Sequence, residues 1–180
     1  MSSMSPDLPV IRDATEADIG AITAIYRDEV EHGVASFEET APSEQEMTAR
    51  MAKVVGLGLP YLAAEDHDGR FLGYSYAGPF HARAAYRFTV EDSIYVDRGA
   101  RRQGVGRALL EELIDRCEKA GCRQMMALIT DTDDSPSIAL HTKLGFRLMG
   151  VAQGVGYKFG QWLDVAYMQL PLGLGRTIAG

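Results

Sequence analysis

The stretch "SIYVDRGARRQGVGRALLEELIDRCEKAG" at residues 93–121 decides the fold of this chain. It opens with a β-branched and aromatic run typical of a strand, passes through an arginine- and glycine-rich segment at 100–106, and continues with apolar residues at helical spacing. Glycines between a strand and a helix let backbone N–H groups approach an anion, and the positive helix end stabilises its charge. The stretch therefore predicts an α/β fold with an anion site at 100–106.

Three phosphate-binding motifs compete for this segment. A P-loop requires Gly-Lys-Ser/Thr, but Gly104 is followed by Val105. A dinucleotide-binding fingerprint requires a small third residue, where this chain has Leu109. The pattern Arg/Gln-x-x-Gly-x-Gly/Ala is matched by Arg101, Gly104 and Gly106, and its backbone amides suit a pyrophosphate. Taken alone, the hexapeptide favours equally a simple glycine-rich turn with solvated arginines.

Composition and charge limit the classes of partner. The 180 residues, 46% hydrophobic and 24% charged, suffice to bury the core of one domain. We expect a single domain over 1–180, with an ordered core at 9–172 and a flexible tail at 173–180. The net charge of −7 argues against nucleic acid or an anionic membrane as a partner, because phosphates would be repelled overall. A local cluster of four arginines still favours a small anionic ligand: Arg98, Arg101, Arg102 and Arg107.

The first residues and the cysteines bear on localisation. Residues 1–9, "MSSMSPDLP", lack the basic and apolar segments of a secretion signal, and no stretch approaches the roughly 18 apolar residues of a membrane span. We therefore expect a cytoplasmic protein. Cys117 and Cys122 have no paired cysteine or histidine ligands nearby, so we expect free thiols and no metal site.

The rest of the chain alternates between strand and helix patterns. Helices are predicted to start at the capping sequences 15–18 and 43–46 and at Ser135-Pro136. Asp68-Gly69 predicts a hairpin turn. Strands are predicted at 10–12, 61–65, 71–79, 88–96, 124–130, 146–152 and 163–170, with a loop rich in glycine and aromatic residues between the last two.

These segments together resemble a known family. "SIYV", "RRQGVG" and "SIALHTKLGF" are similar to the acetyl-CoA-binding core of the GNAT N-acetyltransferase superfamily. "YAGPFHARAAYRFTVEDSIYV" and "GVGYKFGQWLDVAYMQL" resemble its phosphinothricin and methionine sulfoximine or sulfone N-acetyltransferase branch. The resemblance covers about residues 9–172. It implies an α/β (α+β) fold with a mixed, mostly antiparallel central sheet of six to seven strands flanked by helices.

The resemblance also implies how acetyl-CoA is bound. The glycine segment would hold the pyrophosphate, and a splay between the strand at 88–96 and its neighbour would free backbone amides for the thioester and the pantetheine arm. Where the branch has an asparagine contacting the cofactor, this chain has Asp134, which would repel phosphate, and Lys143 would compensate. The cofactor-binding residues implied are Ile94, Tyr95, Val96, Arg101, Arg102, Gln103, Gly104, Val105, Gly106, Arg107, Asp134 and Lys143.

Acetyl transfer to an amine requires a base, and the strand at 88–96 offers one. Its alternation places Glu91, Ser93 and Tyr95 on one face, which suggests a polar, lined cavity. On the residues alone, a solvated or ion-paired Glu91 beside Arg87 is the favoured interpretation. The resemblance reverses this, because Glu91 stands at the position of the branch's proposed catalytic glutamate. Partial burial would raise its pKa toward a useful value.

A second catalytic candidate is His141 in "ALHTKLGF". Many GNAT enzymes have a tyrosine here that is thought to protonate the leaving thiolate, and the resembling branch has histidine. His141 would act as that acid or as a proton relay with Glu91. A histidine that only packs and hydrogen-bonds is equally compatible with the sequence.

The substrate residues follow from loops that match the branch. Each aromatic or arginine there is by itself more often core or solvated, but Phe37 and Arg83 lie in segments that carry the resemblance. The apolar walls expected are Phe37, Phe80, Tyr86, Tyr157, Phe159 and Trp162, and the partners for a substrate carboxylate or phosphinate are His81, Arg83, Arg87 and Lys158. The substrate-binding set is Phe37, His81, Arg83, Glu91, Asp92 and Ser93.

The expected function is direct acetyl transfer from acetyl-CoA to the amino group of a small phosphinothricin-, methionine sulfoximine- or methionine sulfone-like amino acid. The resemblance also implies a homodimer with the substrate pocket near the interface. One alternative is a GNAT enzyme for another amine, such as a polyamine, an aminoglycoside or a protein N-terminus. A non-catalytic acyl-CoA sensor is less favoured, because Glu91 and His141 are both present.

Overall fold

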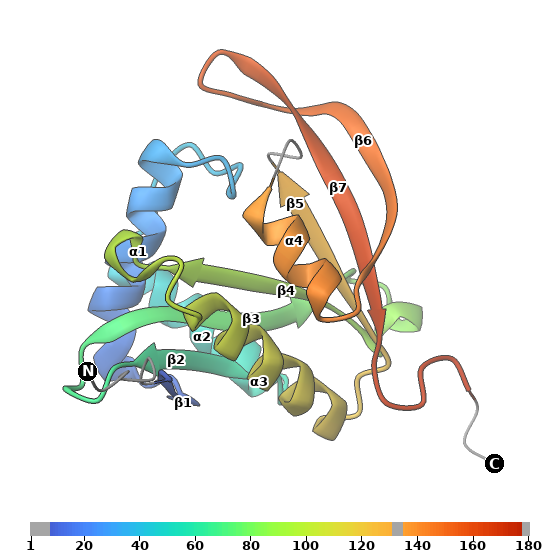
Figure 1. The fold of residues 1–180 in the computed structure, drawn as a ribbon, viewed down its shortest axis with the longest axis horizontal. Coiled ribbons are helices and arrows are strands. Elements are labelled where there is room, and N and C mark those ends of the chain that lie inside the picture. The colour runs from blue at the N-terminus through green and yellow to red at the C-terminus, as the bar shows by residue number, and fades with distance from the viewer. Residues whose placement is uncertain (1–7, 131–134, 178–180) are drawn as a thin grey trace, which may run out of the picture.

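The computed structural model describes residues 8–130 and 135–177 and is built on a seven-stranded sheet of order β1-β2-β3-β4-β5-β7-β6 (Figure 1). The pairing of β4 with β5 is parallel, and the other strand pairs are antiparallel. The strands are β1 Val10–Asp13, β2 Tyr61–Glu65, β3 Phe71–Pro79, β4 Thr89–Val96, β5 Gln124–Thr130, β6 Arg147–Lys158 and β7 Gln161–Pro171. The predicted mixed, mostly antiparallel sheet is confirmed.

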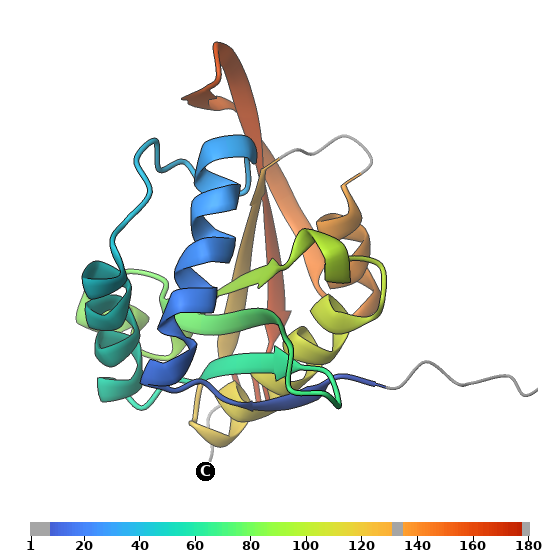
Figure 2. The same ribbon diagram turned by 90° about the vertical axis from the view of Figure 1, so that its left-hand side faces the viewer.

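Helices cover both faces of the sheet. Seen from the side, α1 and α2 lie on one face and α3 and α4 on the other (Figure 2). The helices are α1 Ile19–His32, α2 Glu44–Gly56, α3 Val105–Lys119 and α4 Pro136–Lys143, with short 3-10 turns at Glu16–Asp18, Ala84–Tyr86 and Arg98–Ala100. Each face has its own apolar core, one around α3 and one beneath α1 and α2. The central strands are therefore packed against helices on both faces.

The capping sequences act as predicted. Ser43 Oγ accepts from the Glu46 amide at the start of α2, and Ser135 caps α4 with Pro136 in its first turn. At the first helical turn, the Asp18 carboxylate accepts from the Thr15 amide at 2.8 Å.

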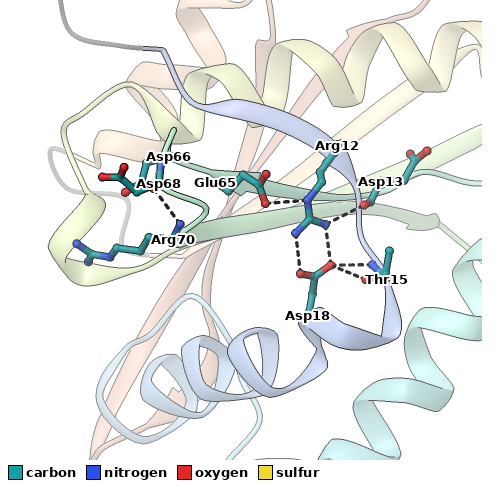
Figure 3. A network of polar contacts seen from close by, with 8 residues as sticks. All are labelled: Arg12, Asp13, Thr15, Asp18, Glu65, Asp66, Asp68 and Arg70. Carbon is teal, nitrogen blue, oxygen red and sulfur yellow. Dashed lines mark hydrogen bonds and ion pairs between the residues drawn. The ribbon is translucent and has the colours of Figure 1, made fainter.

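Arg12 ties the start of α1 to the sheet (Figure 3). Its guanidinium donates two hydrogen bonds of 2.8 Å to the Asp18 carboxylate, and its Nε donates to Glu65 at 2.8 Å. Asp18 lies before α1, Arg12 on β1 and Glu65 on β2. A bidentate guanidinium–carboxylate pair fixes direction as well as distance, so α1 is anchored at its first turn.

The hairpin of β6 and β7 differs from the prediction. The sequence predicts a loop between 152 and 163, but β6 continues to Lys158 and β7 already begins at Gln161. Gly154, with φ +59°, lies where the β6–β7 register shifts, so this glycine permits a bulge and does not end the strand. Phe159 and Gly160, both with positive φ, form the tight turn. The hairpin consequently projects beyond the rest of the sheet (Figure 1).

The chain after β7 turns back on itself. The amide of Gly175 donates to the Leu172 carbonyl at 2.8 Å, and that of Thr177 donates to the Leu174 carbonyl at 3.0 Å. The remainder of the expected flexible tail, 178–180, lies outside the described residues. Within the described part of the chain, every helix is too short or too polar to cross a membrane.

Candidate active site

The two central strands diverge along their length. β4 pairs with β5 only over Thr89–Glu91, opposite Gln124–Met126, although it pairs with β3 as far as Val96. We call this divergence after Glu91 the β4–β5 fork. It confirms the expected splay and leaves the β5-facing backbone of residues 94–96 without a strand partner, where it can bind a ligand.

The glycine segment forms the start of α3. Gly104 is the N-cap in the left-handed conformation, with φ +85°, and Arg102 two residues earlier has φ +64°. The helix begins at Val105, inside the predicted motif, so the amides of residues 105–107 belong to its first turn and have no intrahelical acceptor. A Cβ on Gly106 would make ordinary contact with the side chains of Leu140 and Val96. The segment is thus a helix N-terminus suited to an anion.

Most of the clustered arginines have carboxylate partners in the chain. Arg98 contacts Asp28 at 2.5 Å, Arg101 contacts Glu29 at 3.5 Å, and Arg107 contacts Glu111 at 2.8 Å. Among the described residues, the exposed Arg102 has no carboxylate partner. Gln103 donates to the Gly99 carbonyl at 2.8 Å and so braces the preceding turn.

Glu91 and Asp92 lie on opposite faces of β4. The register places Tyr61, Tyr76 and Ser93 side by side across β2, β3 and β4. Glu91 is two residues before Ser93 on β4 and therefore lies on the same face. This face is covered by α1 and α2. Burial, and secondarily the charge of Asp92, raises the pKa of Glu91 above its usual range, as the sequence predicted.

A cavity of about 210 Å³ opens on this face, between α2 and the sheet. Tyrosine dominates its lining, which comprises Tyr26, Met47, Arg50, Lys53, Val54, Leu57, Tyr61, Tyr74, Tyr76 and Pro79. Glu91 is one strand away, because it pairs with Gly78, the residue before Pro79, and its charge contributes to raising the pKa of Tyr76. Glu91 thus lies close to the cavity on the same face of the sheet.

The tyrosines of the cavity are neutral hydrogen-bonding groups. Burial raises the pKa of Tyr26 to about 12 and also raises that of Tyr61 and Tyr74. Tyr74 is fully buried and its hydroxyl has no hydrogen-bond partner among the described residues. These tyrosines were not among the site residues predicted from the sequence. The signal was present in "FLGYSYAGP", where Tyr74 and Tyr76 alternate and must share one face of the strand.

His141 lies on the other face of β4, away from Glu91. Its Nε2 is 3.0 Å from Asp92 Oδ2, and its Nδ1 is 2.7 Å from the Ser137 carbonyl oxygen. The side chains of His141 and Asp92 are 3% and 4% exposed. The arrangement offers no relay between His141 and Glu91, because the strand itself separates the two side chains.

The loop after α1 is held by three elements. Thr130 of β5 donates to the Val34 carbonyl at 2.6 Å, and Lys158 of β6 donates to the Ser36 carbonyl at 2.6 Å. The Ser36 hydroxyl is 2.9 Å from that of Tyr26 on α1. Phe37 lies against Gly156 so closely that a Cβ there would overlap its ring. Lys158, expected to bind substrate, is instead buried beneath this loop.

The loop between β3 and β4 carries the other expected substrate residues. His81 and Arg83 are exposed, and the imidazole Nδ1 of His81 accepts from the Arg83 amide at 3.2 Å. The Tyr86 ring lies 4.9 Å from His81 and 5.9 Å from Phe80. This loop adjoins Glu91, because the residues flanking it, Pro79 and Val90, pair across the sheet.

The remaining predicted residues lie further out. Lys143 is exposed at the end of α4, and Asp134 lies outside the described residues. Tyr157, Phe159 and Trp162 are more than half exposed on the β6–β7 hairpin, so the expected apolar walls do not form one enclosure. Among the described residues, no group of three or more potential metal ligands occurs.

The sequence profile of the Acetyltransferase (GNAT) family matches residues 22–146. The chain belongs to the GNAT acetyltransferase family. This GNAT chain is 50% identical over 167 residues to a phosphinothricin N-acetyltransferase of Alcaligenes faecalis. The matched residues make up 93% of this chain and 84% of the relative. It is 40% identical, over 93% of this chain and 96% of the relative, to an L-methionine sulfoximine/L-methionine sulfone acetyltransferase of Pseudomonas aeruginosa.

Solved structures agree with the sequence comparison. The crystal structure of a phosphinothricin acetyltransferase from Sinorhizobium meliloti in complex with AcCoA superposes with a TM-score of 0.91 and 50% identity. The match covers 95% of this chain and 92% of that one. The expected family, fold class and acetyltransferase class are therefore confirmed.

Proposed function

We propose that this GNAT enzyme transfers the acetyl group of acetyl-CoA directly to the α-amino group of a small amino acid with a tetrahedral phosphorus or sulfur group, of the phosphinothricin, methionine sulfoximine or methionine sulfone type. The observation that carries the proposal is the half-buried Glu91 at the β4–β5 fork, on the same face as the tyrosine-lined cavity. Relatives at 50% and 40% identity bear the names of these activities.

The donor fits the β4–β5 fork and the start of α3. The free amides of residues 105–107 and Arg102, which has no carboxylate partner among the described residues, would bind the pyrophosphate, assisted by Lys143. The pantetheine arm would enter the β4–β5 fork and hydrogen-bond to the open backbone of residues 94–96. The same backbone would stabilise the oxyanion that develops on the thioester carbonyl.

Glu91 supplies the base. Its carboxylate takes a proton from the substrate ammonium, directly or through one water, and the amine attacks the thioester carbon. The new C–N bond forms and the nitrogen, now positively charged, loses its second proton to solvent. The C–S bond breaks, and the thiolate of coenzyme A takes a proton from solvent. The raised pKa brings the base closer to neutrality, where removal of an ammonium proton is less unfavourable.

The tyrosine-lined cavity would bind the acceptor's side chain. Neutral tyrosine hydroxyls can donate to phosphinyl or sulfonyl oxygens, and Tyr76 is the tyrosine of this set that is only partly buried. Ser93 lines the same face, and Phe37 would close the site from the loop after α1. His81 and Arg83 would pair with the substrate carboxylate from the loop beside Glu91.

We also propose a homodimer formed through the β6–β7 hairpin. β6 is an edge strand, and the hairpin exposes large apolar side chains that water solvates poorly: Leu148, Met149, Val151, Val155, Tyr157, Phe159 and Trp162. A second copy would cover them.

The two cysteines bear on where the protein is located. Cys117 and Cys122 are free thiols, which are typical of the reducing cytoplasm, so we infer a cytoplasmic location.

Release of free thiol from acetyl-CoA, measured across a panel of amines, tests the function. The panel contains phosphinothricin, methionine sulfoximine, methionine sulfone, methionine, a polyamine, an aminoglycoside and an N-terminal peptide. We expect the highest kcat/KM for the first three. A preference for a polyamine, aminoglycoside or peptide would overturn the substrate assignment. Tight acetyl-CoA binding without turnover of any amine would indicate a sensor.

Glu91→Gln tests the base. We expect kcat/KM for the best amine to fall about 10² to 10⁴-fold, the usual contribution of general base catalysis, with acetyl-CoA affinity unchanged. Glu31→Gln, on the exposed end of α1, is the matched control. An unchanged kcat/KM between about pH 6 and 9 in Glu91→Gln would exclude this carboxylate as the base.

A further inference from the structure

We propose that Asp92 and His141 form a buried positioning pair that holds α4 against β4 at the β4–β5 fork, and that His141 exchanges no proton with the substrates. This inference deepens the proposed acetyl transfer and rests on it for its kinetic tests. It is carried by the hydrogen bonds, burial and location of the two side chains.

Both ring nitrogens of His141 are occupied. The Ser137 carbonyl oxygen can only accept, so Nδ1, at 2.7 Å, carries a hydrogen. At 3.0 Å from Asp92 Oδ2, Nε2 either donates to the carboxylate or accepts from its protonated form. In either form one proton is shared within the pair. No N–H or lone pair of His141 is left to reach a thiolate or an ammonium.

The pair is also closed off from solvent and substrate. The two side chains are 3% and 4% exposed, and the Phe146 ring lies edge-on to His141 with centroids 4.8 Å apart. A general acid must come within about 3 Å of the atom it protonates, or reach it through one water. To do so, His141 would have to leave both partners, and the buried Asp92 carboxylate would then have no partner among the described residues.

The place of the pair explains what it does. Asp92 is the first residue of β4 beyond the last residue that pairs with β5. His141 belongs to α4, the helix that follows β5 in the chain. The hydrogen bond therefore joins the two sides of the β4–β5 fork at its vertex. The bond therefore fixes the position of α4 relative to the proposed donor site. Leu140 of α4 lies near Gly106 in the first turn of α3.

Few other charges face the pair. Across α3, Asp92 contributes to raising the pKa of the Cys117 thiol, and along β4 it contributes to raising that of Glu91. Burial lowers the pKa of His141, but its hydrogen bond to Asp92, the charge of Asp92 and the Ser137 carbonyl together raise it above the ordinary 6.5. Asp92 Oδ1 has no partner among the described residues, so His141 is the group that holds this carboxylate in place.

Three variants separate positioning from proton transfer. In His141→Gln the amide nitrogen can replace Nε2 as a donor to Asp92 but cannot release a proton at neutral pH. His141→Ala removes both the donor and the packing. Asp92→Asn keeps a hydrogen bond to a neutral His141 without the charge. His67→Gln, in the exposed β2–β3 turn, is the control for a histidine substitution.

We expect His141→Gln to keep kcat within about tenfold of the wild type, although loss of a general acid costs about 10² to 10⁴-fold. His141→Ala should lose about 100-fold in kcat, the scale of a misplaced reacting group, and should bind acetyl-CoA more weakly. Asp92→Asn should keep kcat within about tenfold and move the acid limb of kcat/KM to lower pH, because Glu91 loses a neighbouring charge. Equal losses of 10²-fold or more in His141→Gln and His141→Ala would overturn the proposal.

A second measurement does not depend on turnover. In ¹⁵N-edited spectra of the imidazole groups, His141 should keep its Nδ1 proton from about pH 6 to 9, with and without coenzyme A. Loss of that proton in this range would overturn the positioning role. If the wild type acetylates no amine, the proposed function fails, whereas the spectra and the acetyl-CoA affinities of the variants still decide the role of the pair.

Discussion

At the scale of single residues, Gly104 and Gly106 at the start of α3 are needed for different reasons. Gly104 has φ +85°, a conformation that costs any other residue strain, although nothing lies within 4 Å of where its Cβ would be. Gly106 has an ordinary φ, and its Cβ would meet Leu140 at 3.6 Å, an ordinary contact. The first is required for the direction of the backbone, and the second only limits side-chain size near the donor.

We therefore expect Gly104→Ala to raise the KM for acetyl-CoA and Gly106→Ala to leave it nearly unchanged. Strain of about 1–2 kcal/mol at position 104 corresponds to about a five- to thirtyfold rise if it is relieved by moving the amides that bind the pyrophosphate. Steady-state kinetics of both variants measure this. Equal effects at the two positions would show that space, and not φ, governs the segment.

The buried hydroxyl of Tyr74 leads to a second prediction at the scale of single residues. An unpartnered buried hydroxyl is destabilising, so Tyr74→Phe should leave the thermal midpoint unchanged or raise it, by up to about 1 kcal/mol in unfolding free energy. Because the hydroxyl is closed off from the cavity, the KM for the amine should stay unchanged. A rise of about two- to tenfold, the value of one hydrogen bond, would show that the hydroxyl reaches the acceptor. Differential scanning fluorimetry and kinetics give both numbers.

At the scale of elements, the start of α1 and the loop after α1 are each fixed by a carboxylate and an arginine. Hydrogen bonds from Arg12 lower the pKa of Asp18 below 3.8, against the effect of burial. Hydrogen bonds from Arg50 on α2 likewise lower the pKa of Glu38, in the loop after α1, below 4.5. Both groups are ionised when folded and are harder to protonate than in the unfolded chain.

Their stabilisation is fully present above the unfolded pKa values and is lost as pH falls through the lower folded values. The free energy of unfolding should therefore fall below about pH 4.5, and less steeply in Asp18→Asn/Glu38→Gln. At pH 7 this double variant should be about 2 kcal/mol less stable, mostly through the less exposed Asp18. Urea unfolding from acid to neutral pH measures it, and parallel pH profiles would contradict the assignment.

The same elements show what the sequence could predict. Capping residues and alternating patterns are local signals, so the starts of α2 and α4 and the strands β2–β5 were placed correctly. Gly154 and Gly156 predict a loop, because glycine is typical both of loops and of bulged strands, and only the pairing with β7 distinguishes the two. Lys158 was assigned to substrate for a similar reason: its acceptors at 33 and 36 are more than 100 residues away. Contacts between residues so far apart in the sequence cannot be predicted from local sequence patterns.

At the scale of the whole molecule, charge and apolar exposure are unevenly distributed. The chain carries a net charge of −7, yet its edge strand β6 and the adjoining turn expose a run of large apolar side chains. An edge strand that exposes apolar side chains can pair with another strand or with another copy of the chain. The hairpin also carries Lys158 and Gly156, which support the loop beside the proposed acceptor site. Association through this hairpin would therefore stiffen the site as well as cover the edge.

Val155→Lys tests this association. Val155 is 56% exposed on β6, so a lysine there is tolerated by the fold, but in a dimer it would bury an unpaired charge. We expect the variant to sediment as a monomer where the wild type sediments as a dimer, with a higher KM for the amine and a similar thermal midpoint. Val55→Lys, at a position 53% exposed on α2, is the matched control and should remain dimeric. A dimeric Val155→Lys would show that a different surface joins the two copies, and a monomeric wild type would exclude the homodimer at the concentrations used.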